Sequence, residues 1–168
     1  SVVILLAMSI VIYFAAKYYR KIYGWLLSMV PAGLFLAFVY NYNFADTKIL
    51  SFNFPWIELF DIGLHFRTDG LSYLFSFLIL GIGALIVLYA WAYMKTYENK
   101  ERLLLILVVF MASMLGLVNA DDLILLFVFW ELTSITSFLL VGFNHTDEKS
   151  RKAAQQALLI TVFGGLAL

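Results

Sequence analysis

Long apolar runs recur along this chain, and they constrain its fold more than any other feature. A helix needs roughly 20 mostly apolar residues to cross a bilayer, because the hydrocarbon core is about 30 Å thick and a helix rises about 1.5 Å per residue. Six segments reach or approach this length, namely residues 2–16, 22–40, 71–94, 103–118, 123–143 and 153–168. We therefore predict an all-α polytopic membrane protein with about six transmembrane helices.

The composition agrees with a membrane protein and excludes several functional classes. Of the 168 residues 64% are hydrophobic and 13% are charged, and the mean hydropathy of +0.94 leaves too little polar surface for a soluble globule. A net charge of zero without a basic block excludes nucleic-acid binding. The lack of cysteine excludes disulfides, thiolate zinc sites and cysteine-ligated iron–sulfur clusters. The two histidines stand in separate polar segments, so we expect neither a cofactor nor a bound metal.

The two ends of the sequence predict a piece of a longer protein. The chain begins at Ser1 without an initiator methionine, and it stops at Leu168 inside the last apolar run. The start does not resemble a signal peptide, because the basic residues follow the first apolar run instead of preceding it. We find no repeat, low-complexity linker or second domain in the sequence. Residues 1–168 are therefore expected to form part of one transmembrane domain that continues.

Basic residues alternate between the connections and so predict an orientation. Lysine and arginine in short connections favour the cytoplasmic side of a membrane. The turn at residues 119–122 has no basic residue, whereas the first, third and fifth connections carry Lys17, Arg20, Lys21, Lys95, Lys100, Arg102, Lys149, Arg151 and Lys152. We therefore place these three connections in the cytoplasm. The N-terminus, the loop at residues 41–70 and the turn at residues 119–122 are expected outside.

Part of the long outer loop has a strand pattern. Ile62, Leu64 and Phe66 alternate with polar residues, and residues 49–54 form a second candidate strand that Pro55 ends. The two segments predict a small extracellular β-hairpin that lies over the helix ends. Thr68 or Asp69 then caps the next helix, because either side chain can accept the unpaired amide hydrogens of a first turn.

Glu131 is the strongest candidate for a functional residue. It lies near the middle of residues 123–143, which contain no other ionisable side chain. A charge at mid-membrane costs from about 2.5 to more than 10 kcal/mol, so an acid in this position indicates function. Its helix places a polar sector of Thr133, Ser134, Thr136 and Ser137 on one side, and an apolar arc of Ile124, Val128, Leu132, Ile135 and Leu139 on the other. We expect this helix inside a bundle, with Thr133, Ser134 and Ser137 as supporting residues and Trp130 packed against the acid.

Each of these residues also has a purely structural interpretation. Serine and threonine hydroxyls in membrane helices often donate to a carbonyl one turn back. Glu131 could be a neutral or ion-paired structural acid, although no basic residue lies inside the other apolar runs. Asp121 and Asp122 could gather cations at an outer mouth, but we favour a role as helix caps. His65 and His145 are expected to be interfacial side chains.

Three segments resemble a known family. Residues 66–72 (FRTDGLS), 119–134 (NADDLILLFVFWELTS) and 137–143 (SFLLVGF) look like the N-terminal part of the large A subunit of Mrp-type multisubunit Na⁺/H⁺ antiporters. The likeness extends over essentially the whole chain. The related antiporter-like subunits of respiratory complex I typically carry Glu-Gly-Val-Gly where this chain has Glu131-Leu132-Thr133-Ser134, and an Asp where Gly165 stands. These differences favour the Mrp branch.

The resemblance implies a function and its partners. It implies a subunit of a hetero-oligomeric antiporter in the cell membrane of a prokaryote, which uses the proton gradient to extrude Na⁺ in pH and sodium homeostasis and is not an enzyme. Its implied partners are the other Mrp subunits, especially the homologous D subunit. Glu131 matches the essential glutamate of the family's fifth helix, which pairs with a lysine on a later helix. A proton-pumping subunit of complex I or of a membrane hydrogenase, and a non-transporting membrane scaffold, remain as alternatives.

Overall fold

The computed structural model describes residues 23–44, 50–57, 62–94, 100–144 and 146–167. These residues form five helices and one hairpin, in the order α2 (Tyr23–Phe44), β1 (Leu50–Ile57), β2 (Ile62–Thr68), α3 (Gly70–Tyr93), α4 (Lys100–Val118), α5 (Leu123–Val141) and α6 (Glu148–Leu166). The helix predicted at residues 2–16 lies outside the described residues.

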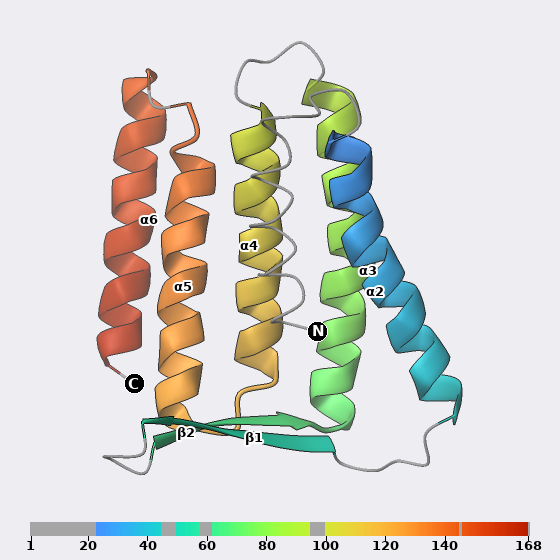
Figure 1. Ribbon diagram of the computed structural model, residues 1–168. Helices are drawn as coiled ribbons and strands as arrows, with labels where there is room; N and C mark the ends of the chain where they lie inside the picture. The colour runs from blue at the N-terminus through green and yellow to red at the C-terminus, as the bar shows by residue number, and fades with distance from the viewer. Residues whose placement is uncertain (1–22, 45–49, 58–61, 95–99, 145, 168) are drawn as a thin grey trace.

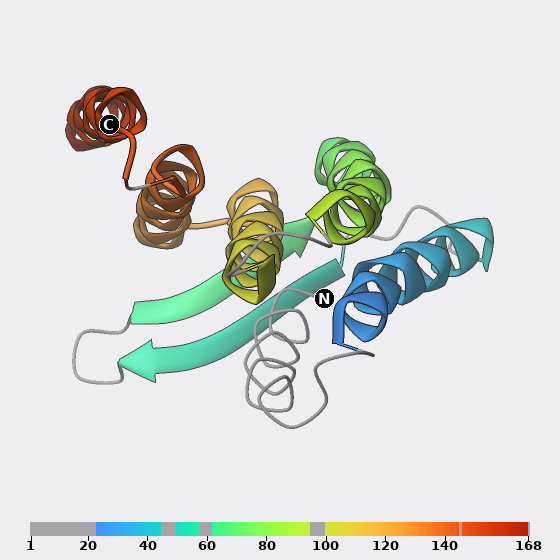
Figure 2. The same ribbon diagram turned by 90° about the horizontal axis from the view of Figure 1, so that it is seen from above.

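The helices stand side by side in a bent row, and each packs mainly against the next one along the chain (Figures 1 and 2). The hairpin crosses one end of this row (Figure 1). The core lies around α4, whose buried face meets α3 on one side and α5 on the other; its members are Leu80, Val87, Leu104, Val108, Met111, Ala112, Leu115, Leu125 and Phe129. The central position of α4 therefore fixes the distance between α3 and α5.

Three of the described helices are long and apolar enough to cross a membrane. These are α3, α4 and α5, while α2 has an apolar stretch at Met29–Tyr40. Large apolar side chains stay exposed on the outer faces, as Leu85 on α3 and Ile160 on α6 illustrate with 67% and 73% exposure. Such faces suit lipid or further protein. The number of six spans stays a prediction.

Two helices begin earlier than predicted, because charged residues form their first turns. We expected helices at residues 103–118 and 153–168, but α4 begins at Lys100 and α6 at Glu148. The Asp147 carboxylate caps α6 by accepting from the amides of Lys149 and Ser150. Hydrogen bonds from the Ser150 hydroxyl and the Lys149 amide hold the pKa of Asp147 below its ordinary value. The sequence analysis placed the basic residues from position 149 onward in a connection between helices. In the structure they lie on α6 instead.

Glycines allow close contacts between neighbouring helices. A Cβ at Gly83 on α3 would overlap the Met111 side chain of α4, and a Cβ at Gly116 on α4 would overlap the Phe129 ring of α5. Small residues at such positions let helices approach and pack, which is the main source of association in apolar surroundings. Gly116 thereby sets the depth at which the first half of α5 packs on α4.

The predicted hairpin is present. β1 pairs with β2 in antiparallel register, from Leu50 opposite Thr68 to Ile57 opposite Ile62. The prediction that Pro55 ends the first strand is wrong, because β1 continues to Ile57 past an irregularity in the register after Pro55. Proline lacks an amide hydrogen and is tolerated at such a bulge. Asp69 caps α3 as predicted, and its side chain accepts from the amide of Ser72.

Asn119 joins the hairpin to the helices. Its side-chain amide donates to the Ser76 hydroxyl of α3 at 3.1 Å and to the Leu115 carbonyl of α4 at 2.8 Å. Its Oδ1 accepts from the Thr68 hydroxyl of β2 at 2.7 Å, and its carbonyl accepts from the Arg67 amide at 2.9 Å. Asn119 is only 8% exposed, so its polar groups are hydrogen-bonded inside the protein and not to solvent. We call it the Asn119 clamp.

Removal of the clamp should release the hairpin from the helix ends. In the full-length protein Asn119→Ala leaves buried polar groups unpaired, at a cost of about 1–3 kcal/mol. Since 1.4 kcal/mol is a factor of ten, amides of Ile62–Thr68 should exchange with deuterium about 5 to 150 times faster when measured by mass spectrometry. Asn144→Ala, at an exposed position at the other end of the bundle, is the control. Equal exchange in both variants would refute the clamp.

Candidate functional site

Glu131 lies near the middle of α5 and faces α6. A Cβ built on Gly165 of α6 would lie 2.5 Å from Glu131 Oε1, so the carboxyl occupies the space that a side chain at this position would fill. Oε1 is buried and has no hydrogen-bond partner among the residues that the structure describes. Buried polar atoms are nearly always paired in native proteins, and an exception calls for a group that completes it. Within the described residues, the acid predicted from sequence therefore has a buried oxygen without a partner.

Trp130 ties this part of α5 to α6. Its indole Nε1 donates to the Thr161 carbonyl at 3.5 Å, one turn before Gly165. The indole edge also borders Gly165, since a Cβ there would lie 2.9 Å from Trp130 Cδ1. Trp130 thus lies beside the same glycine as the carboxyl, and its packing against the acid itself stays a prediction.

The hydroxyls near Glu131 donate to carbonyls of their own helix. Thr133 and Ser134 both donate to the Trp130 carbonyl, at 2.7 and 3.1 Å, and Thr136 donates to the Leu132 carbonyl at 2.8 Å. This is the structural role that serines and threonines often have in membrane helices. Ser137 lies further along α5 and is half-buried. Thr133 and Ser134 lie on the turn that contains Glu131, but their hydroxyls donate to the backbone.

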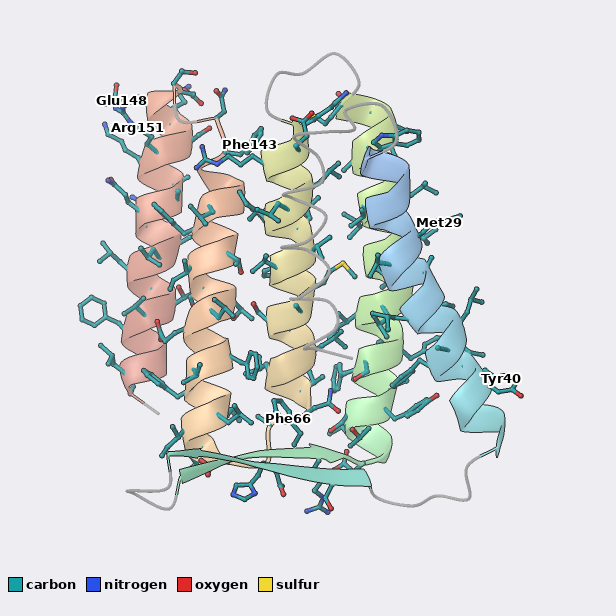
Figure 3. All side chains as sticks on the ribbon, in the orientation of Figure 1. Met29, Tyr40, Phe66, Phe143, Glu148 and Arg151 are labelled. Atoms are coloured by element: carbon teal, nitrogen blue, oxygen red, sulfur yellow. The ribbon has the colours of Figure 1, made fainter. Side chains whose placement is uncertain are left out.

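Phe129 fixes α5 just before the acid. It is 8% exposed, packs on Gly116 of α4, and its ring centroid lies 6.0 Å from that of Phe66 in the hairpin. Figure 3 shows Phe66 at the junction between the hairpin and the helix ends. Contacts from α4, α6 and the hairpin therefore hold the turn that carries Glu131.

The two outer-mouth candidates have structural contacts at the start of α5. Asp122 caps the helix, and its carboxylate accepts from the Ile124 amide at 2.7 Å. Asp121 forms an ion pair with Arg67 of β2 at 3.8 Å, with both side chains about half-exposed. The capping interpretation is confirmed for Asp122, whereas Asp121 pairs with Arg67 and is not the N-cap of α5.

Sequence reasoning missed two parts of the site. It noted Gly165 only as a difference from complex I subunits, and it did not single out Thr161. Helical periodicity shows which residues share a face of one helix, but it does not show which residue of the next helix lies opposite. The pair Gly164-Gly165 was the available signal, and only the structure shows that one of the two faces the acid.

Comparisons with known proteins agree on one family. Residues 55–104 match the family model described as NADH-ubiquinone oxidoreductase (complex I), chain 5 N-terminus. Residues 120–168, which include Glu131 and Gly165, match the model described as NADH:quinone oxidoreductase/Mrp antiporter, TM. The chain is also 42% identical over 164 residues to the A subunit of the Na⁺/H⁺ antiporter of Alkalihalophilus pseudofirmus, which covers 96% of this chain. This chain is a relative of the Mrp antiporter A subunits.

Other members of the Mrp family support the assignment. The A1 subunit of the Na⁺/H⁺ antiporter of Staphylococcus haemolyticus is 39% identical over 172 residues and covers 100% of the chain. The solved structure of the Mrp complex from Dietzia sp. DQ12-45-1b superposes with a TM-score of 0.80 at 30% identity and covers 98% of the chain. The chain spans about a fifth of the length of these relatives, at 20%, 21% and 18%. The resemblance inferred from sequence is confirmed.

The cap of α5 should contribute measurably to stability. Asp122→Ala removes the acceptor of the Ile124 amide and should cost about 0.5–2 kcal/mol, whereas Asp122→Asn should retain most of this contribution because asparagine is an equally good cap. The thermal unfolding midpoint of the purified full-length protein in detergent would measure the difference. Equal midpoints for the alanine variant and the unmodified protein would contradict the capping role.

Proposed function

We propose that this chain is part of a membrane-embedded subunit of a proton-gradient-driven Na⁺/H⁺ antiporter, with Glu131 as the acid that transfers protons. One observation carries the role of Glu131, namely a buried carboxyl oxygen in mid-helix without a hydrogen-bond partner in the described residues. The relatives that match along the chain are named Na⁺/H⁺ antiporter subunits, which supports the transport function. Such a protein is a secondary transporter and not an enzyme.

The proposed mechanism rests on the attraction between a carboxylate and a cation. A cation within a few ångströms of a carboxyl favours its ionised form. A cation that approaches Glu131 would therefore release its proton, and withdrawal of the cation would let the proton return. The resemblance implies that this cation is a lysine of a later helix. Na⁺ would be coupled by competition for the acid or at another place in the complex.

The protein is proposed to lie in the cell membrane of a prokaryote, with the hairpin outside. The hairpin and the Asp121 turn lie at one end of the helix row, and the basic first turns of α4 and α6 lie at the other (Figure 1). Figure 3 places Arg151 and Glu148 at the end opposite the hairpin. Basic residues favour the cytoplasmic side, so the second end would face the cytoplasm.

The partners would be the other subunits of an Mrp complex, with the D subunit as the foremost candidate. The solved structure that matches this chain is that of an Mrp complex, and apolar side chains remain exposed on the outer faces of α3 and α6. Thr133 and Ser134 would support the acid by keeping its turn polar, and Ser137 would extend this polar stretch along α5. Asp121 would shape the outer entrance.

A proton-pumping subunit of a complex I type machine is the second candidate. The family model that matches residues 55–104 describes complex I chain 5, which favours it for that segment. The relatives at about 40% identity along nearly the whole chain are antiporter subunits, which favours the first proposal. Proton exchange that requires Na⁺ but no redox substrate would distinguish the antiporter subunit from the complex I type pump.

Neutralisation of the acid should abolish transport. In everted membrane vesicles that contain the complete complex, Glu131→Gln should lower Na⁺-dependent proton exchange by about 100-fold or more, as expected for loss of a proton-transfer group. A fluorescent probe of the pH gradient measures the exchange, and immunoblotting checks assembly. Glu148→Gln is the matched control, since Glu148 is an exposed acid that pairs with Lys152 at 2.8 Å. Normal exchange by the Glu131 variant would refute its role.

The orientation can be tested separately from transport. The sequence contains no cysteine, so a single cysteine at Ser51 or at Lys152, both exposed, is a unique label site within this part of the protein. A maleimide that does not cross membranes should label the Ser51→Cys variant in intact cells and the Lys152→Cys variant only in everted vesicles. The reverse pattern would place the hairpin in the cytoplasm.

A further inference from the structure

The contact between Glu131 and Gly165 points to a positioning role for a residue outside α5. Gly165 is buried, and the carboxyl of Glu131 and the indole edge of Trp130 lie where its side chain would be. We call this place the Gly165 notch. We propose that the Gly165 notch sets the position of the Glu131 carboxyl, and that Gly165 is therefore a positioning residue for proton transfer. The inference rests on the function proposed above.

The geometry leaves no room for a side chain in the notch. A Cβ at position 165 would lie 2.5 Å from Glu131 Oε1 and 3.0 Å from Trp130 Nε1, whereas ordinary contacts begin at 3.4 Å. Something therefore has to move by about 1 Å, which is a displacement large enough to cost a reaction about 100-fold when it affects a reacting group. Gly164 is the opposite case, because nothing lies within 4 Å of a Cβ there.

The helices themselves resist such a movement. Near the other end of the same pair of helices, a Cβ at Gly142 just after α5 would lie 3.2 Å from the Ala154 Cβ of α6, and Ala154 is fully buried. On its opposite side α5 is held by Phe129 against Gly116 of α4. Packed helices tolerate added volume poorly. The glutamate side chain has several rotatable bonds and makes the shortest contact, so the carboxyl moves out of the notch and the Trp130 indole edge shifts less.

Proton transfer depends on this position because hydrogen bonds weaken steeply with distance and angle. Oε1 makes no hydrogen bond to the described residues, so no polar partner holds the carboxyl from this side. On this side its place is set by its contact with α6, where Gly165 leaves a gap in the helix surface. A group that pairs with Glu131 must therefore reach its carboxyl in the position that the Gly165 notch gives it.

The test compares two adjacent glycines in the complete complex. Gly165→Ala should lower Na⁺-dependent proton exchange in everted vesicles about 10- to 100-fold, while Gly164→Ala should stay within about twofold of the unmodified complex. A second readout follows the carboxyl itself, through the rate at which a hydrophobic carbodiimide modifies the acid at position 131, measured by mass spectrometry. Gly165→Ala should raise this rate at least threefold, because it drives a buried oxygen into the open, and Gly164→Ala should leave it unchanged.

A second variant tests the notch with α6 intact. Glu131→Asp shortens the acid by one methylene and withdraws the carboxyl from Gly165, so carbodiimide modification should again become faster. This variant decides the question where Gly165→Ala does not assemble. The notch is refuted if the two glycine variants show equal exchange and equal modification, or if Glu131→Asp is modified no faster than the unmodified complex.

The modification rate also separates this inference from the proposed function. If Glu131→Gln retains exchange while Gly165→Ala still speeds modification, the notch positions the acid but the acid does not carry the proton. If Glu131→Gln abolishes exchange and neither readout distinguishes Gly165→Ala from Gly164→Ala, the acid is functional and the notch is refuted.

Discussion

Polar groups in the apolar part of this bundle have to find their partners inside the protein, and the structure is organised around that requirement. The hydroxyls of α5 donate to carbonyls of their own helix, the Trp130 indole donates to α6, and the Asn119 side chain is matched by two helices and the hairpin. Within the described residues Glu131 Oε1 is the buried side-chain atom that lacks a partner. The position of the acid is thus the one place in the described part of the bundle where a buried side-chain oxygen has no partner.

Close approach of helices is the second requirement, and it explains how an acid can be held without a hydrogen bond. Glycines let α4 meet α3 and α5 at short distance, and Gly165 does the same between α5 and α6. With packing on both sides, the turn around Glu131 has a fixed place even though Oε1 of its carboxyl has no partner among the described residues. Comparison with the Mrp relatives adds that this arrangement of helices recurs in a solved complex with a TM-score of 0.80.

Much of this architecture was predictable from the sequence. Apolar runs located the helices, alternation in residues 62–66 located a strand, and the lone charge in residues 123–143 identified the candidate site. The start of α6 was predicted too late, because a capped helix tolerates charged first turns that look like a loop. The Asn119 clamp was not predictable, since its partners Thr68 and Ser76 lie 51 and 43 positions away in the sequence. Gly165 was missed for the same reason, because its importance depends on which residue of α5 faces it.

The packing of each helix against its successor has a consequence for how the protein is made. Contacts between neighbours in sequence have low contact order and form without long loop closures. The row of helices can therefore assemble in the order in which the ribosome delivers them, with α3 and α4 in place before α5 is complete. The hairpin is the exception, because it is synthesised before α3 but finds its partner in the turn between α4 and α5. Its docking would therefore wait until the turn between α4 and α5 has been made.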